Sequence, residues 1–379
     1  MLAAASRQDE PDTLRTRLKR RIRADGPLTI AEYMEACLSD PEFGYYATGE
    51  PFGVRGDFTT APEISQIFGE LIGLWSAVVW QQMRTPERVG LVELGPGRGT
   101  LMADALRAAK AVPEFRNACE VHLVETSPVL RDVQAKQLEA AGVAVNWHDN
   151  LANIPSGPAI VIANEFLDAL PVRQFTKSGE HWVERCVGLS DGGALEFQTG
   201  PEVAASELII SPDLQSRADD GDVVECRPYA RELVAQLAER AQQVPLMALI
   251  IDYGHDASAP GETLQAVRAH DFADPLMSPG KADLTAHVDF GELGVLAAQN
   301  GLYAFGPISQ GHFLLGLGLK ERCEKLIAAA DPGMRDSIVS GAQRLVDPAQ
   351  MGELFRVMAI GSSKATPPAL PDVQNGAEQ

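Results

Sequence analysis

Three closely spaced glycines, Gly95, Gly97 and Gly99, follow a short apolar stretch that ends in Glu93 and Leu94. An apolar run of this length that leads into glycines is typical of a strand followed by a tight turn and a helix. Because glycine has no side chain, such a turn lets the backbone pass close to a ligand. The spacing therefore indicates a ligand-binding turn at a strand end, with the carboxyl group of Glu93 beside it.

The spacing of these glycines separates two classes of adenosyl-binding fold. A dinucleotide site requires the pattern G-x-G-x-x-G, and Thr100 occupies the place of its third glycine. The observed pattern G-x-G-x-G, preceded by an acid, is typical of S-adenosylmethionine domains. That cofactor carries no pyrophosphate, and its cationic amino group suits an acid at Glu93. We expect S-adenosylmethionine as cofactor and keep an NAD(P)-dependent oxidoreductase as the alternative.

Two further strand ends offer polar groups to the same ligand. The next apolar run, Val121 to Glu125, ends in an acid that can accept both hydroxyl groups of a ribose. After the third run, Asp149 is expected to bind the adenine amino group, with Asn150 beside it. The alternative is that Asp149 and Asn150 only form a turn or a helix cap.

The fourth and fifth apolar runs, 159–163 and 246–253, end in groups that can hold a cation or a proton. Ligands in open parallel sheets bind beyond the carboxyl ends of the strands, so these groups are expected at one edge. The candidate catalytic residues are Asn164, Glu165, Asp168, Asp252 and His255. Carboxylates here could grip a guanidinium and aid proton loss, whereas an acid after a strand is often a helix cap. His255, like His287, is more often a hydrogen-bonded loop residue.

A glycine-rich loop precedes the first convincing strand. Its residues Asp57 and Phe58 could close over the cofactor as a lid, and Asp57 and Thr60 are candidate cofactor-binding residues. The alternative is a simple connector. Thr60 and Glu63 form a capping-box pattern, which predicts a helix that runs to about Gln82.

The elements around these residues alternate in a way that predicts a parallel sheet. Helical spacing and capping patterns predict helices from residue 13 to 26 and from 29 to 38. Strand and helix then alternate from Val89, as in βαβ units. The segment 172–227 interrupts this order with a hairpin that turns at 177–180. We therefore expect an N-terminal helical region with a lid loop (1–85), a doubly wound α/β domain (86–362) with this insertion, and a disordered tail (363–379).

Composition excludes several classes of function. The chain of 379 residues carries 32 Lys and Arg against 52 Asp and Glu, and its net charge of −20 repels nucleic acid and anionic membranes. The five cysteines lack Cys-x-x-Cys and metal-ligand spacing, which predicts reduced thiols and no metal site. No apolar run is long enough to span a bilayer. We expect a cytoplasmic protein of bacterial type, with the mitochondrial matrix as the alternative because an Arg-rich segment follows the N-terminus.

Five segments together resemble one known family. They are 56–70 (GDFTTAPEISQIFGE), 92–100 (VELGPGRGT), 163–171 (ANEFLDALP), 252–254 (DYG) and 283–290 (DLTAHVDF). This set is similar to the MidA family of S-adenosylmethionine-dependent methyltransferases, and the similarity extends from Leu14 to Gly361. The resemblance implies a class I (Rossmann-like) methyltransferase fold.

The resemblance also implies an acceptor. The mitochondrial member of the family dimethylates an arginine symmetrically on a core subunit of NADH dehydrogenase, and assists the assembly of respiratory complex I. We therefore expect a protein substrate with an arginine side chain, no nucleic acid partner and no membrane span, and we leave a homodimer open. A non-catalytic assembly chaperone that binds S-adenosylmethionine is the further alternative.

Overall fold

The computed structural model describes residues 12–48, 60–204, 208, 210–268 and 271–371. The chain folds into two compact units. Unit 1 comprises 1–51, 171–228 and 259–286, and unit 2 comprises 52–170, 229–258 and 287–379. Every candidate site residue that the structure describes falls within unit 2, so this unit positions the site.

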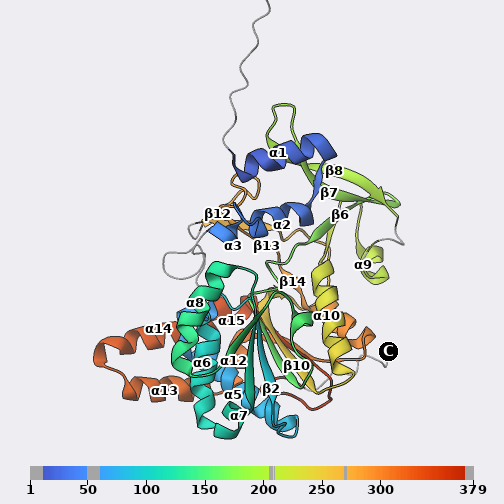
Figure 1. The fold of residues 1–379 in the computed structure, drawn as a ribbon. Coiled ribbons are helices and arrows are strands. Elements are labelled where there is room, and N and C mark those ends of the chain that lie inside the picture. The colour runs from blue at the N-terminus through green and yellow to red at the C-terminus, as the bar shows by residue number, and fades with distance from the viewer. Residues whose placement is uncertain (1–11, 49–59, 205–207, 209, 269–270, 372–379) are drawn as a thin grey trace, which may run out of the picture. The chain divides into compact units, whose positions relative to one another are not determined.

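Unit 2 is built on an eight-stranded sheet (Figure 1). Its strands are β2 (Val89–Leu94), β3 (Cys119–Val124), β4 (Val145–His148), β5 (Ala159–Asn164), β10 (Leu246–His255), β14 (Val288–Asp289), β15 (Tyr303–Ser309) and β16 (Phe355–Gly361). The order is β15-β16-β10-β5-β2-β3-β4, and β14 pairs with the end of β10. The five strands from β10 to β4 are parallel, whereas β15 and β16 are antiparallel. The carboxyl ends of the five parallel strands therefore meet at one edge.

Helices cover both faces of this sheet, which explains its continuous apolar strands. Leu91 and Ile162 point to the face covered by α5 and α6, and Val92 and Ala163 point to the face covered by α10 and α11. Figure 1 shows α5 and α6 on one side and α10 on the other. The helices of unit 2 are α4 (Ala61–Ile64), α5 (Gln66–Gln82), α6 (Thr100–Ala108), α7 (Pro113–Ala118), α8 (Pro128–Leu138), α10 (Pro228–Ala241), α11 (Phe290–Gln299), α12 (Gln310–Gly316), α13 (Leu319–Ala329), α14 (Arg335–Val346) and α15 (Met351–Leu354). Short 3-10 helices lie at Ala109–Ala111, Glu139–Ala141, Leu151–Asn153 and Pro332–Met334.

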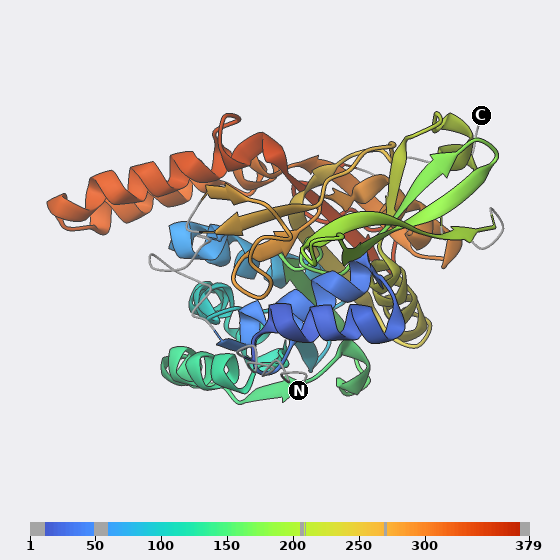
Figure 2. The ribbon, with the colours of Figure 1, turned by 90° about the horizontal axis from the view of Figure 1, so that it is seen from above.

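Helices α13 and α14 form a hairpin, drawn in orange in Figure 2. Arg322 of α13 pairs with Glu70 of α5 at 2.6 Å, and Arg107 of α6 pairs with the same carboxylate at 3.1 Å. Glu70 is only 1% exposed, and a buried carboxylate is tolerated when it is paired. This ion pair ties the hairpin to the helices that cover the sheet.

Unit 1 consists of two antiparallel sheets with helices. Its elements are α1 (Leu14–Asp25), β1 (Leu28–Thr29), α2 (Ile30–Ser39), α3 (Tyr45–Thr48), β6 (Arg173–Ser178), β7 (His181–Leu189), β8 (Leu195–Val203), α9 (Pro212–Arg217), β9 (Val223–Cys226), β11 (Gln265–Arg268), β12 (Asp271–Ala273) and β13 (Asp283–Thr285). One sheet has the order β1-β7-β6-β9, with β8 on β7, and the other has the order β12-β11-β13. The expected hairpin of the insertion is confirmed as β6 and β7.

The structure differs from the sequence-based expectations in three places. The helix expected from Thr60 to Gln82 is broken at Ser65, whose extended backbone and hydroxyl group begin α5, while Thr60 makes no side-chain cap bond. The expected N-terminal region 1–85 is divided between the two units. Part of the expected disordered tail is packed, because Trp75 donates to the Pro368 carbonyl at 3.2 Å and Leu370 is buried.

All five cysteines are free thiols. None of the helices in the described part of the chain is long and apolar enough to cross a membrane.

Candidate active site

The glycine turn lies at the end of β2, in the middle of the parallel sheet. Gly95, Gly97 and Gly99 have φ angles of +61°, +52° and +82°, which side-chain-bearing residues rarely adopt. A β-carbon on Gly95 would lie 2.7 Å from the ring of Phe166. Gly99 is the N-cap of α6 and contributes no side-chain cap. The three glycines are therefore required by backbone conformation, and they leave the first turn of α6 open to a ligand.

Glu93 lies at the penultimate position of β2 and is 3% exposed. Burial raises the pKa of its carboxyl group to about 8, although a hydrogen bond from the Met102 amide favours the ionised form. Its Oε2 atom is buried and has no hydrogen-bond partner among the described residues. A buried carboxyl oxygen without a partner is rare in native proteins and is often explained by a missing ligand.

Glu125 follows the end of β3 and is tied to the glycine turn by a residue that the sequence analysis missed. Gln134 of α8 is fully buried; its amide donates to Glu125 Oε2 at 3.2 Å and to the Gly97 carbonyl at 2.8 Å. Trp147 of β4 donates to Gln134 Oε1 at 2.9 Å. The other oxygen of Glu125 accepts from the Ser127 amide, and burial raises the pKa of Glu125. Gln134 thus connects the ends of three neighbouring strands.

The remaining candidate cofactor residues have different surroundings. Asp149 is exposed and pairs with Arg131 at 2.7 Å. Asn150 accepts from the Asn153 amide and caps a short 3-10 helix, as the alternative interpretation had it. Asp57, like Phe58, lies outside the described residues. Thr60 is described and lies in the cleft beside the glycine turn.

Glu165 follows β5 and reaches a helix that is remote in sequence. Its Oε1 atom accepts from the Ala61 amide of α4 at 2.8 Å and from the Asn164 side chain at 3.2 Å. Burial raises the pKa of Glu165 to about 8, and the charge of Asp168 acts in the same direction. The φ angle of Glu165 is +50°, a strained conformation for a residue with a side chain. Asn164 Oδ1 is buried and lacks a partner among the described residues.

Asp252 holds this strained turn in place. The residue is fully buried, and its Oδ2 accepts from the amides of Phe166, Leu167 and Asp168 at 2.9 to 3.2 Å. Its Oδ1 accepts from the Tyr253 amide. This arrangement makes Asp252 a positioning group for the loop that carries Glu165.

The other acidic and histidine candidates lie apart from the cleft lining. Asp168 is 5% exposed, and its Oδ1 accepts from the Ala169 amide within the same loop. His255, at the end of β10, lies 3.7 Å from Asp289. His287 stacks edge-on against Tyr253, with ring centroids 5.4 Å apart.

A narrow cleft at the carboxyl edge of the sheet brings the main candidates together. Glu93, Asn164 and Glu165 line it together with residues of the glycine turn and of α4. It also contains Glu63, which accepts from the Thr100 hydroxyl group, and the exposed Arg98. The sequence analysis used Glu63 only as a helix-cap signal and did not consider Arg98. The position of Arg98 inside the glycine motif was the signal from which a role at the ligand site could have been predicted.

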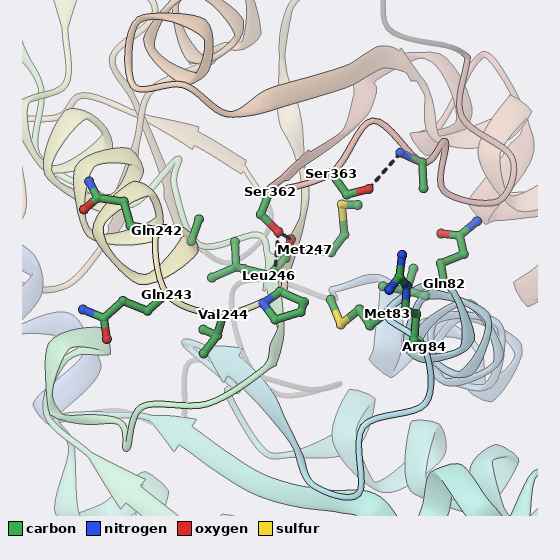
Figure 3. A pocket seen from close by; sticks show the side chains of 14 residues that line it. Gln82, Met83, Arg84, Gln242, Gln243, Val244, Leu246, Met247, Ser362 and Ser363 are labelled. Atoms are coloured by element: carbon green, nitrogen blue, oxygen red, sulfur yellow. Dashed lines mark hydrogen bonds between the residues drawn. The ribbon is translucent and has the colours of Figure 1, made fainter.

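A second, larger pocket lies at the opposite edge of the sheet (Figure 3). It has a volume of about 460 Å³ and is bordered by the ends of α5 and α10 and by the start of β10. Arg84 is the only ionisable residue among the described residues that line it, and none of the described site candidates belongs to this lining. Ligands of open α/β sheets bind at the other edge, so the narrow cleft is the better candidate.

The residues at the carboxyl edge fit S-adenosylmethionine. The unpartnered oxygens of Glu93 and Asn164 suit its ammonium group. Glu125 suits its ribose hydroxyl groups, because a carboxylate has lone pairs beyond the two that Ser127 and Gln134 use here. The glycine turn leaves space where the backbone must approach the ligand.

Comparisons with known proteins agree with this fit. Residues 71–308 match the family model of S-adenosyl-L-methionine-dependent methyltransferases. The mitochondrial protein arginine methyltransferase NDUFAF7 homolog of Drosophila melanogaster is 37% identical over 94% of this chain and 87% of its own length. The human protein arginine methyltransferase NDUFAF7 is 35% identical over 90% of this chain and 81% of its own length.

A solved structure from Burkholderia thailandensis, bound to S-adenosyl-homocysteine, is also similar. It has a TM-score of 0.77 and 29% sequence identity, and the match covers 92% of this chain and 91% of that chain. The expected class I methyltransferase fold and the expected cofactor are thereby confirmed, and the oxidoreductase alternative is set aside. The chain belongs to the family of S-adenosylmethionine-dependent methyltransferases.

Proposed function

We propose that this methyltransferase modifies a guanidinium nitrogen of an arginine in a protein partner. The geometry of Glu165 carries the proposal. Its carboxyl group lies in the cleft beside the glycine turn, held by the Ala61 amide and by Asn164. A carboxylate held in this way can accept hydrogen bonds from a guanidinium without first having to be ordered.

The charge of the cleft supports a cationic acceptor. Among the described residues that line it, three are carboxylic acids, Glu63, Glu93 and Glu165, and one, Arg98, carries a guanidinium. With Glu93 assigned to the cofactor ammonium, Glu63 and Glu165 remain for the acceptor. Asp168, which the sequence had suggested as the second gripping acid, is absent from the lining. We therefore propose Glu63 in its place.

The proposed chemistry requires a proton to leave the acceptor. Bound S-adenosylmethionine supplies a methyl group on sulfur that is open to in-line attack. Glu165 would orient one guanidinium nitrogen toward the methyl group and would take the proton that this nitrogen loses. The N–C bond would form as the bond from the methyl carbon to sulfur breaks, and S-adenosylhomocysteine would be the leaving group. With its pKa raised to about 8 by burial, Glu165 is largely protonated in the free protein at pH 7, and the guanidinium that it binds would favour the ionised form that takes up the proton.

The acceptor is proposed from the relatives. The NDUFAF7 proteins are named protein arginine methyltransferases, and the resemblance to the MidA family implied a core NADH dehydrogenase subunit. We propose symmetric dimethylation of an arginine on such a subunit during complex I assembly. The eukaryotic relatives are mitochondrial by name. Their names support the mitochondrial matrix as the compartment, rather than the cytoplasm that the sequence analysis expected. The homodimer, which the sequence analysis left open, stays open.

Mass spectrometry tests the acceptor directly. NADH dehydrogenase subunits are compared between cells that lack this protein and the same cells complemented with wild type, Glu165→Gln or the exposed control Glu139→Gln. Wild type and Glu139→Gln should restore the arginine methylation. Glu165→Gln should reduce methyl transfer by about 100-fold or more, the usual scale for a positioned acid-base group, with cofactor affinity within a few-fold of wild type.

Two outcomes would contradict the proposal. If Glu165→Gln lost cofactor binding, Glu165 would belong to the donor site. If it transferred methyl groups normally, another carboxyl group would have to grip the acceptor.

A further inference from the structure

Two buried acceptor atoms in the cleft lack the hydrogen bonds that buried atoms normally make. They are Glu93 Oε2 and Asn164 Oδ1, on the neighbouring strands β2 and β5, and their residues are 3% and 8% exposed. Neither atom has a partner among the described residues. Leaving such an atom unpaired is unfavourable, so two in one cleft point to a ligand that donates to both.

The orientation of the Asn164 amide is fixed by its neighbour. Its Nδ2 donates to Glu165 Oε1 at 3.2 Å, and the same oxygen already accepts from the Ala61 amide. Turning the amide over would set two acceptor oxygens against each other. Asn164 therefore presents its oxygen to the cleft, and an ammonium group, with three N–H donors, can satisfy it together with Glu93.

Arg98 supplies the opposite charge in the same cleft. It is exposed, and within the described part of the chain its guanidinium makes no ion pair or hydrogen bond. It stands between Gly97 and Gly99, directly before the first turn of α6. The N-terminus of a helix adds partial positive charge to that of the side chain, and both favour an anion.

We infer that Asn164 and Arg98 recognise the two charged groups of the cofactor's amino acid end. Asn164, with Glu93, accepts from the ammonium group, and Arg98 binds the carboxylate. Asn164 is thereby moved from the catalytic set, where the sequence had placed it, to the cofactor-binding set. Arg98 makes the site selective for a cofactor that has kept its carboxylate.

A matrix of variants and ligands tests this assignment by calorimetry, independently of any methyl acceptor. The ligands are S-adenosylhomocysteine, its decarboxylated form, which lacks only the carboxylate, and 5′-methylthioadenosine, which lacks both charged groups. The variants are Arg98→Met, Asn164→Leu and Asn164→Asp. Arg88→Met serves as the charge-matched control, because Arg88 is exposed and precedes the opposite end of β2.

Arg98→Met should weaken S-adenosylhomocysteine about tenfold or more and leave the other two ligands unchanged, as expected for loss of a charged hydrogen bond. Asn164→Leu should weaken both ligands that carry the ammonium group and spare 5′-methylthioadenosine. Asn164→Asp keeps an acceptor oxygen and should restore ammonium binding. Arg88→Met should behave as wild type.

Equal weakening of all three ligands by Arg98→Met would overturn the assignment, because it would mean that Arg98 only shapes the turn. Unchanged S-adenosylhomocysteine affinity in Arg98→Met or in Asn164→Leu would overturn the assignment for that residue. Binding of 5′-methylthioadenosine reports that each variant is folded. These results do not depend on whether arginine is the methyl acceptor.

Discussion

Glu93 is expected to release a proton when the cofactor binds. In the free protein its pKa is raised to about 8 by burial, so at pH 7 about nine molecules in ten carry the proton. The ammonium group of S-adenosylhomocysteine, placed beside the unpartnered Oε2, would stabilise the ionised form. The bound state therefore holds Glu93 as a carboxylate, and the proton leaves.

The size of this effect follows from the pKa. Release should be about 0.9 proton per ligand at pH 7 and about 0.5 at pH 8, where half of Glu93 is already ionised. Because only the ionised form binds well, the affinity should rise about ninefold from pH 6 to pH 7. Ionising the free protein at pH 7 costs about 1.4 kcal/mol, which the ammonium group must offset.

Calorimetry in buffers of different ionisation enthalpy measures the protons directly. The slope of observed enthalpy against buffer ionisation enthalpy gives the number released. Glu93→Gln keeps the shape of the side chain and should remove the release. Glu139→Gln is the control, because Glu139 is exposed and is absent from the cleft lining. Equal proton numbers in wild type and Glu93→Gln, or proton uptake, would refute the reasoning.

Three further predictions concern the frame of the site. Gly97→Val should abolish S-adenosylhomocysteine binding, because valine is strained at a φ of +52°. Calorimetry measures the affinity, and an unchanged far-ultraviolet circular dichroism spectrum would show that the variant is folded. Asp252→Ala leaves four backbone amides without their acceptor. The variant should therefore have a free energy of unfolding about 3 to 5 kcal/mol lower than wild type, measured by urea titration. A decrease below about 1 kcal/mol would contradict the positioning role. Burial lowers the pKa values of His122 and His148, whose ring nitrogens lie 3.0 Å apart, and the charges of His148 on His122 and of Arg131 on His148 act in the same direction. The unfolded chain therefore takes up protons that the folded pair does not as the pH falls through about 6.5. Wild type should therefore lose stability relative to His122→Asn between pH 7.5 and pH 5.5, and parallel stability curves would argue against it.

Local sequence patterns were sufficient for much of the methyltransferase fold. The capping box of Thr29 and Glu32 is present as predicted, and Ser127 with Pro128 begins α8. The predicted strands of the parallel sheet agree with the structure to within about two residues. These elements are predictable because their signals, such as apolar periodicity and turn residues, act between near neighbours along the chain. The strands β15 and β16 lacked such a signal, and their antiparallel pairing depends on residues far apart in sequence.

The roles of individual acids followed a different rule. In the sequence, Glu165, Asp168 and Asp252 were all candidate catalytic acids, because each lies at or shortly after the end of an apolar run. In the fold, Asp252 accepts hydrogen bonds from backbone amides, and Asp168 accepts a hydrogen bond within its own loop. Of these three acids, only Glu165 lines the cleft. The direction of a side chain at a strand end depends on the turn that follows and on the elements packed against it.

The sequence by itself determined the cofactor class, because the glycine spacing and the acids Glu93 and Glu125 lie on consecutive strand ends whose positions follow from local structure. Only the tertiary structure decided which groups share the cleft. Ala61 and Glu165 are separated by 104 positions, and Gln134 joins Gly97 to Glu125 and Trp147. No short-range sequence pattern predicts these contacts, because they form where helices and strands that are distant in the sequence pack together.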